Sequence, residues 1–302
     1  MSNVPDVDGL LVLDKPAGMT SRAVVNRVQR WFPKRTRIGH AGTLDPLATG
    51  VLVLGLGEAT RLIEYVQRMD KVYRTRLLLG ARSDSDDADG VITPVAGAVA
   101  ADAATVAKCV AAFVGVLAQV PPAYSAAKVA GQRAYDRARR GEAVVLSPRR
   151  VQVHAIHILD YSYPYLDLEV RCGKGVYIRS LARDIGARLG CGALVHTLRR
   201  TRIGPFTSEE ALTLDADAQT VHTHLLPMEK AVGELPQLVL PESGRKCLEQ
   251  GQAITLPEAL KGVENNTEVA VVDAAGRLAA VALVDPVRPQ LRPIKVFQSK
   301  KR

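Results

Sequence analysis

The sequence predicts an α/β protein of the α+β kind, in which a mixed, largely antiparallel sheet is flanked by helices and followed by a small C-terminal β-barrel. Candidate strands and helices follow one another irregularly, with hairpins among them, whereas a doubly wound parallel sheet repeats a strict β-α unit. The composition changes near residues 233–236, and the segments beyond resemble strands. We therefore expect two domains, residues 1–234 and residues 235–302.

The first elements are a buried strand and a helix. Residues 10–13 form an unbroken apolar run, typical of a strand buried on both faces, and this strand ends before Pro16. Thr20 or Ser21 can cap the following helix, because a hydroxyl there accepts a hydrogen bond from the first turn. The apolar positions at helical spacing are Val24, Val28, Trp31 and Phe32.

Later segments alternate between the two periodicities. The expected strands are residues 73–79, 152–159 and 165–172. The expected helices are residues 103–117 and 178–189. Near the C-terminus, residues 268–282 read as two strands joined by a glycine-containing turn, and residues 291–297 as a closing strand. A unit of this size buries little apolar surface, so we expect it to pack against the larger domain.

One loop, residues 39–50, is punctuated by glycines and carries a single carboxylate, that of Asp45. Pro46 favours extended backbone at Asp45, and the glycines allow turns and close approach of a ligand. Asp45 is therefore displayed on a loop and followed by an apolar strand. An Asp before a Pro is most often only a turn residue, so its neighbours decide whether it has a chemical role.

The chain has 302 residues, 47% of them hydrophobic, which is enough for a sizeable core. Its longest apolar runs are far shorter than the roughly 20 residues that span a bilayer, and residues 1–8 lack the layout of a secretion signal. We expect a soluble, cytoplasmic protein. The four cysteines are widely spaced without a C-x-x-C pair, which indicates neither a zinc site nor a disulfide framework.

The formal net charge of +9 suits a polyanionic partner without identifying it. Residues 121–150 hold seven basic residues against two acidic ones, with Tyr124 and Tyr135 among them. Such a run is often just a solvated surface, but aromatic rings beside arginines are what unstacked bases and phosphates require. We therefore expect this segment, which includes Lys128, to contact RNA.

Two patterns resemble metal sites and are not interpreted as such. Residues 84–90 look like a calcium loop, but aligning Gly90 with the loop's glycine places Ser85 and Ala96 where carboxylate ligands belong. We interpret the segment as a polar turn. His154 and His157 lie in an alternating strand segment that turns them to opposite faces. We expect no metal site.

Four ordered motifs resemble the bacterial TruB-type family of tRNA pseudouridine-55 synthases and cover most of residues 9–204. The similar segments are residues 13–21 (the family's first motif), 39–50 continued by 56–61 (its catalytic motif), 70–74 (its tyrosine segment) and 172–181 (its arginine segment). The resemblance implies a pseudouridine-synthase fold with a mobile RNA-binding thumb loop at about residues 121–150. It also implies that the C-terminal β-barrel is a PUA-like RNA-binding domain.

The resemblance also implies the reaction, which is isomerisation of uridine 55 in the T-loop of tRNA after base flipping. In the family the matching Asp is the nucleophile, so Asp45 is the expected nucleophile here. Arg179 is the expected partner that keeps this carboxylate charged. Tyr73 offers a ring to stack on uracil and a hydroxyl to move a proton. The reaction transfers no electrons and no carried group, so we expect no cofactor.

Further substrate-binding residues follow from the same resemblance. Tyr177 and Leu198 are expected in the pocket wall, and His40 at the position that enters the space left by the flipped nucleotide. Lys15 is expected to support the site or a phosphate, although a purely structural role is equally compatible with its position. Lys128 comes from the basic segment described above.

Two other functions stay open at this stage. The chain could be a tRNA-binding or tRNA-folding chaperone whose catalysis is dispensable, or a hydrolase that uses Asp45. The hydrolase would need a positioned water and usually a second carboxylate or a metal, and no such set is visible. We expect a monomer that binds the T-arm stem-loop of tRNA without an obligatory protein partner, guide RNA or membrane.

Overall fold

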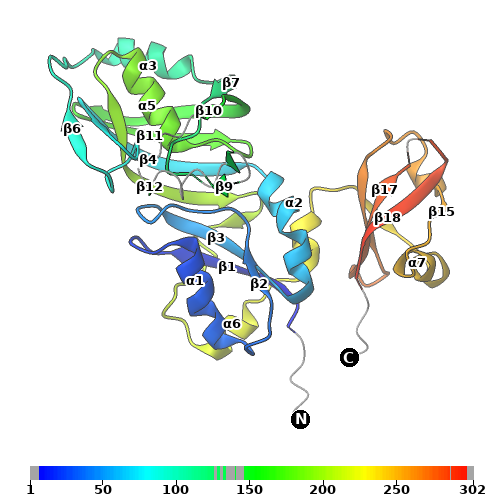
Figure 1. The fold of residues 1–302 in the computed structure, drawn as a ribbon. Coiled ribbons are helices and arrows are strands. Elements are labelled where there is room, and N and C mark those ends of the chain that lie inside the picture. The colour runs from blue at the N-terminus through cyan, green and yellow to red at the C-terminus, as the bar shows by residue number, and fades with distance from the viewer. Residues whose placement is uncertain are drawn as a thin grey trace.

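The computed structural model describes residues 7–125, 128–129, 132–133, 140, 146–285 and 287–297, with only the backbone course of residues 128–129 and 132–133. Two sheets organise the chain: a large one in the N-terminal and central part, and a smaller one near the C-terminus (Figure 1). None of the helices in this part of the chain has the length and apolar character that a membrane crossing requires.

The large sheet has nine strands in the order β1-β3-β12-β4-β11-β10-β7, with β2 paired to β3 and β13 paired to β12. Its strands are β1 (Gly9–Lys15), β2 (Ile38–His40), β3 (Thr49–Leu56), β4 (Lys71–Leu79), β7 (Gly115–Gln119), β10 (Arg149–Ser162), β11 (Tyr165–Cys172), β12 (Ala193–Ile203) and β13 (Phe206–Thr207). The β12–β3 pair is parallel and the other pairs are antiparallel. The expected mixed, largely antiparallel sheet is confirmed.

Helices cover the two ends of this sheet. The helices of this part are α1 (Ser21–Val28), η1 (Gln29–Trp31), η2 (Gly57–Leu62), α2 (Ile63–Arg68), α3 (Ala103–Ala111), α5 (Ile178–Arg188), α6 (Ala218–Thr223) and η3 (Met228–Val232). Helices α3 and α5 pack against β4, β10 and β11 around one apolar core, whereas α1 and α6 pack against β1 and β3 around another (Figure 1). Thr20 caps α1, as expected, because its hydroxyl accepts a hydrogen bond from the Ala23 amide at 3.0 Å.

One predicted helix is wrong in its second half. The sequence predicted a helix over residues 103–117, but α3 ends at Ala111, and residues 115–119 form β7 at the edge of the sheet beside β10. Gly115 adopts a φ of +115°, which a helix does not accommodate. Apolar residues at 110, 113, 114 and 117 fit helical spacing, but pairing with β10 sets the structure here.

Two short hairpins lie outside the large sheet. The first joins β5 (Ala81–Ser83) to β6 (Ile92–Pro94) and carries the polar turn of residues 84–90 at its tip. The second joins β8 (Lys128–Val129) to β9 (Gln132–Arg133) within the basic segment. The polar turn is thus fixed at both ends by strand pairing.

The C-terminal part forms a curled five-stranded sheet in the order β14-β16-β17-β18-β15 (Figure 1). Its elements are β14 (Gln237–Val239), α7 (Glu242–Glu249), β15 (Ile254–Thr255), η4 (Glu258–Leu260), β16 (Glu268–Val272), β17 (Leu278–Val284) and β18 (Gln290–Val296). The expected hairpin and closing strand are confirmed. The domain boundary at 234/235 stays a prediction.

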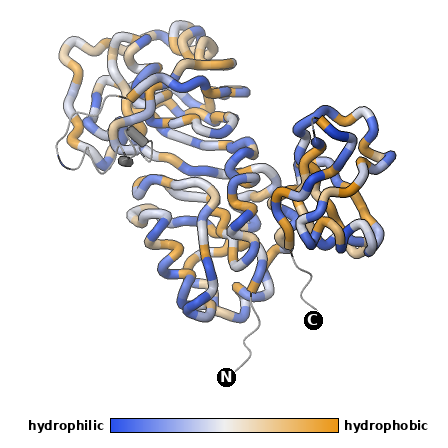
Figure 2. Tube along the Cα trace, turned by 45° about the vertical axis from the view of Figure 1, so that its right-hand side comes forward, coloured by the Kyte–Doolittle hydropathy of each residue, from blue (hydrophilic) through white to orange (hydrophobic). Residues whose placement is uncertain are grey.

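The small sheet has an apolar cluster of its own, which includes Leu238, Leu248 and Leu291, and it also packs against η2 and α2, as expected. Phe297 and Val281 share an apolar cluster with Leu62 and Val66, and orange segments meet at this contact in Figure 2. The Arg61 guanidinium lies 4.8 Å from the centre of the Phe297 ring. Ion pairs surround the contact, among them Lys295–Glu64 at 2.7 Å. The two sheets are therefore joined by a mixed apolar and charged interface.

Gly50 allows β3 to lie close beside β12. Its φ is +99°, and a side chain there would place Cβ 2.1 Å from the carbonyl oxygen of Arg200. Because that oxygen belongs to a buried strand, it has little freedom to move away. The end of the Asp45 loop therefore depends on a residue without a side chain.

We expect Gly50→Ala to lower the free energy of unfolding by about 3 kcal/mol or more, because backbone strain and overlap with a buried strand add together. Gly97→Ala is the control, since Gly97 also has a positive φ (+71°) but has open space around it. That change should cost only about 1–2 kcal/mol. Denaturant unfolding measures both, and equal losses would contradict the close-approach explanation.

Candidate active site

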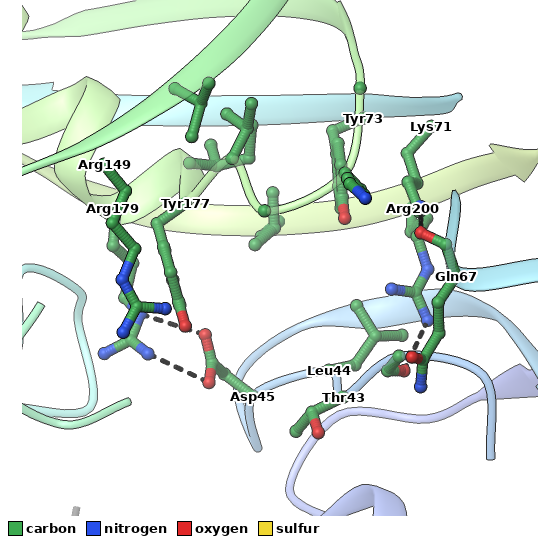
Figure 3. A pocket seen from close by; sticks show the side chains of 18 of the residues that line it. Thr43, Leu44, Asp45, Gln67, Lys71, Tyr73, Arg149, Tyr177, Arg179 and Arg200 are labelled. Carbon is green, nitrogen blue, oxygen red and sulfur yellow. Dashed lines mark hydrogen bonds and ion pairs between the residues drawn. The ribbon is translucent and has the colours of Figure 1, made fainter. Parts of the chain in front are cut away.

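A cavity of about 520 Å³ opens beside the loop of residues 39–50. Its walls come from that loop, from β4 and β12, from the start of β10 and from the N-terminal end of α5 (Figure 3). The predicted residues that line it are Asp45, Tyr73, Tyr177, Arg179 and Leu198. Segments from five parts of the chain therefore meet at the carboxylate that the sequence singled out.

The segment of residues 13–21 holds the Asp45 loop in place through hydrogen bonds. The ammonium of Lys15, at the end of β1, is fully buried and donates to the carbonyls of Met19 at 2.6 Å and Pro46 at 3.3 Å. The Ser21 hydroxyl accepts from the Leu44 amide at 2.8 Å and donates to the Leu44 carbonyl at 3.1 Å. The backbone is thus fixed on both sides of Asp45.

Lys15 supports the loop and does not line the cavity. Burial lowers the pKa of its ammonium to about 8, against the opposing influence of the Asp45 carboxylate. Its hydrogen bonds all go to backbone carbonyls, including those of Pro16 and Met19 in its own turn. Of the two roles left open, the geometry favours support of the site over a phosphate contact.

Asp45 and Arg179 form a two-pronged ion pair. Arg179 Nε lies 2.9 Å from Oδ2 of Asp45, and Nη2 donates to Oδ1 at 3.0 Å. The arginine side chain is only 5% exposed, whereas the Asp45 side chain keeps 33% of its surface open toward the cavity (Figure 3). The pair therefore fixes the carboxylate in orientation while leaving it accessible to a ligand.

Arg179 is itself held by groups that the sequence did not reveal. Its guanidinium donates to the carbonyls of Ser85 at 2.9 Å and Tyr124 at 2.8 Å, and Nε lies 3.6 Å from the buried carboxylate of Asp87. Ser85 and Asp87 belong to the polar turn that resembled a calcium loop. The polar turn thus holds Arg179. Its run of acidic residues was the feature of the sequence that could have indicated this role.

These neighbours act on the Asp45 carboxyl in opposite directions. Burial raises the pKa of Asp45 above its ordinary value, the Arg179 guanidinium lowers it, and the negative charge of Asp87 raises it again. The net direction is upward, because removal from water outweighs the ion pair. Asp45 therefore holds its proton more tightly than an exposed aspartate would.

Tyr73, Tyr177 and Leu198 form the apolar wall of the cavity. Tyr73 on β4 and Leu198 on β12 are largely buried, and the Tyr73 ring points into the cavity (Figure 3). Tyr177 precedes α5, and its backbone is fixed by Gln119, which accepts from the Tyr177 amide at 2.8 Å and donates to its carbonyl at 3.1 Å. Gln119 is buried and was not anticipated from the sequence.

Arg200 forms part of the wall opposite Arg179 (Figure 3). Its side chain is almost fully buried and donates to the carbonyls of Val51 at 2.8 Å and Gly42 at 3.2 Å, which bracket the Asp45 loop. It is also the cross-strand partner of Tyr73. Burial raises the pKa of the Tyr73 hydroxyl, and the positive charge of Arg200 opposes that rise.

The remaining predicted residues lie elsewhere. His40 ends β2 and does not line the cavity. Lys128 lies in β8, and its side chain is outside the described residues. Within the described ranges, no group of three or more His, Cys, Asp or Glu residues could hold a metal ion, and all four cysteines are free thiols.

The cavity is strongly basic. Its only carboxylate belongs to Asp45 among the described lining residues, and the cationic side chains there are Lys71, Arg149, Arg150, Lys174, Arg179 and Arg200. Such a site attracts a polyanion and places one carboxylate beside aromatic rings that can stack on a base.

The fold matches two solved box H/ACA structures. A chain of an H/ACA ribonucleoprotein bound to a substrate RNA containing 2′-deoxyuridine has a TM-score of 0.74 and 25% sequence identity, covering 97% of this chain and 86% of that one. A chain of the archaeal Nop10–Cbf5 complex has a TM-score of 0.73 and 26% identity, covering 97% and 87%. The shared architecture extends through both sheets.

Sequence comparisons identify the family. The model of the TruB family pseudouridylate synthase N-terminal domain matches residues 30–178, and that of the tRNA pseudouridylate synthase B C-terminal domain matches residues 179–233. The tRNA pseudouridine synthase B of Syntrophotalea carbinolica is 40% identical over 92% of both chains, and that of Ruegeria pomeroyi is 41% identical over 97% of this chain and 96% of its own. The chain belongs to the TruB family of pseudouridylate synthases, as its motifs indicated, and is an isomerase.

The electrostatics of the site predict how Asp45 titrates. A carbon-13 NMR titration of its side-chain carboxyl should give a midpoint above the ordinary value of about 3.9. The carboxylate should therefore lose its charge earlier than an exposed one as the pH falls. Asp87→Asn should move the midpoint downward, because it removes the negative charge that opposes ionisation.

Asp160→Asn is the control, since Asp160 is an exposed residue of β10 that does not line the cavity. It should leave the midpoint of Asp45 unchanged. A wild-type midpoint below about 3.9, or an upward shift in the Asp87 variant, would overturn this description of the site.

Proposed function

We propose that this enzyme isomerises uridine 55 in the T-loop of tRNA to pseudouridine, with Asp45 as the nucleophile. The observation that carries the proposal is the Asp45–Arg179 pair, fixed in orientation at the edge of a basic, aromatic-lined cavity. The relatives named above are tRNA pseudouridine synthases, which supports tRNA as the substrate and the cytoplasm as the place of action.

The reaction makes three demands on the site. The bond between ribose C1′ and uracil N1 must break, the detached uracil must turn, and a bond from C5 to C1′ must form. The C5 proton leaves and N1 gains one, so the atoms balance without a redox partner. The enzyme must therefore supply negative charge at C1′, a means of moving a proton and a wall that retains the free base.

Asp45 supplies the charge. Its carboxylate faces the cavity, and Arg179 holds both oxygens so that one geometry is presented to the sugar. When RNA closes over the site and removes water, the guanidinium opposes the rise in the pKa of Asp45 that burial causes, and so favours the ionised carboxylate. Activity should accordingly be lost on the acidic side as Asp45 takes up a proton.

Tyr73 and its neighbours hold the base. The Tyr73 ring can stack on uracil, and its hydroxyl can relay the C5 proton by passing on its own proton as it takes up that one. Leu198 and Tyr177 close the wall, so the detached base turns without escaping. Extruding the nucleotide costs a few kcal/mol of stacking. His40 lies outside the cavity, and its proposed insertion into the vacated space depends on bound RNA.

A chaperone that only binds and folds tRNA explains the site less well. RNA binding alone needs cations and aromatic rings, but it does not need a carboxylate oriented by a buried arginine inside a basic cavity. We propose that the enzyme acts as a monomer on the T-arm stem-loop, without guide RNA, metal or other cofactor. A separate folding activity is compatible with this proposal.

We expect Asp45→Asn to abolish pseudouridine formation in T-arm RNA while changing the RNA dissociation constant by less than about threefold. The amide keeps the size of the side chain but carries no negative charge for C1′. Single-turnover mapping of pseudouridine measures the first quantity, and filter binding the second. Asp160→Asn is the control and should retain wild-type activity.

If the Asp45→Asn protein kept activity within a few fold of the wild type, Asp45 would not be the nucleophile. Activity absent from the wild type as well, with RNA binding intact, would favour the chaperone function instead.

A further inference from the structure

A second basic surface lies outside the cavity, on α1 and the turn that follows it. Residues 15–44 contain seven basic residues and no acidic one, so this tenth of the chain supplies most of the formal net charge of +9. We use the name α1 surface for the exposed side chains Arg22, Arg27, Arg30, Lys34 and Arg35. Neither the family's motifs nor the proposed mechanism accounts for it.

The cations of the α1 surface lack the partners that other arginines of this protein have. On the large sheet, Arg74 pairs with Glu169 at 2.9 Å, and Arg76 pairs with Asp167 at 2.7 Å. Within the described part of the chain, no member of the α1 surface has a carboxylate within 4.0 Å. A merely solvated surface usually mixes the two signs of charge.

The fold forces these cations to one side. Val24, Val25 and Val28 form the apolar side of α1 and pack against β1 and β3. Arg22, Arg27 and Arg30 are thereby left in water, and Arg27 and Arg30 are three residues apart, a spacing at which like charges repel. Bound polyanion would relieve this repulsion.

Helix α1 lies against the Asp45 loop. Ser21, the first residue of α1, hydrogen-bonds to Leu44 in the Asp45 loop. A hollow of about 550 Å³ beside α1 is lined by Arg27, by Thr49 at the end of the same loop, by the ion pair of Arg199 with Asp14, and by Asp215. A chain of phosphates leaving the cavity on this side could therefore continue along the surface of α1.

We propose that the α1 surface binds the ribose–phosphate backbone of the substrate tRNA outside the nucleotide that enters the cavity. The inference rests on the proposed function, since it assumes that RNA occupies the cavity. The surface is separate from the basic segment of residues 121–150, which reaches Arg179 through Tyr124, and from the C-terminal sheet, which packs on α2. The α1 surface would thus be a third tRNA-binding surface, besides the basic segment and the C-terminal sheet.

Counterion release makes the proposal measurable. Each phosphate neutralised by a cation contributes roughly 0.7–0.9 to the slope of log binding constant against log salt concentration. The triple variant Arg27→Gln, Arg30→Gln and Lys34→Gln should lower that slope by about two to three for full-length tRNA. Its affinity at low salt should fall at least about tenfold.

A matched control removes the same charge elsewhere. Arg82, Lys108 and Arg188 are exposed, have no ion pair within the described ranges and lie on the hairpin and helices at the other end of the large sheet. Changing these three to Gln should leave the slope within about 0.5 of the wild type, since they contact no phosphate. Comparing the two triple variants distinguishes the loss of local phosphate contacts from the effect of a lower net charge.

The same measurements on an isolated T-arm stem-loop locate the contact. If the triple variant loses affinity and salt slope only with full-length tRNA, the contacted phosphates lie beyond the T-arm. If it loses them with both RNAs, the phosphates lie in the arm. Either result supports the proposal. An unchanged slope for both RNAs, or equal losses in the control triple, would overturn it. Pseudouridine formation by the wild-type enzyme, assayed in parallel, tests the proposed function separately.

Discussion

The architecture of the site depends on the ion pair between Asp45 and Arg179. Without Arg179, the Asp45 carboxylate would take up a proton more readily. Without Asp45, the buried charge of Arg179 would cost the folded state even more free energy. Each charge therefore requires the other, and the remaining contacts decide how the pair is presented. Ser85, Tyr124 and Asp87 hold the arginine from behind, so that Nη2 donates to Oδ1 of Asp45 and Nε lies close to Oδ2.

The pair joins two segments that lie far apart in the sequence. Arg179 lies at the start of α5, and Leu44 and Ala48, on either side of Asp45, pack in the same apolar core as this helix, while the loop continues into β3 beside β1. The two halves of the sheet meet where β12 runs parallel to β3, and Arg200 there fixes both ends of the Asp45 loop. Lys15 and Ser21 hold the middle of the loop, so its backbone has little freedom before any substrate binds.

The sequence predicted the residues whose type is dictated by chemistry. Asp45, Tyr73, Tyr177, Arg179 and Leu198 do line one cavity. The supporting groups were missed because their role arises only in three dimensions. Asp87 lies in a polar turn whose sequence is that of an ordinary solvated loop. Gln119 lies in β7, most of which the spacing of its apolar residues had predicted to be helical. Lys128 and His40 stay predictions, since they depend on side chains outside the described residues or on bound RNA.

The most direct test of the central claim is the structure of the Asp45→Asn protein bound to a T-arm stem-loop. The account predicts a uridine extruded into the cavity, with its ribose C1′ within about 3.5 Å of the residue 45 side chain and its base against the Tyr73 ring. A uridine that stays stacked in the RNA, or that lies in another hollow with C1′ far from residue 45, would contradict it.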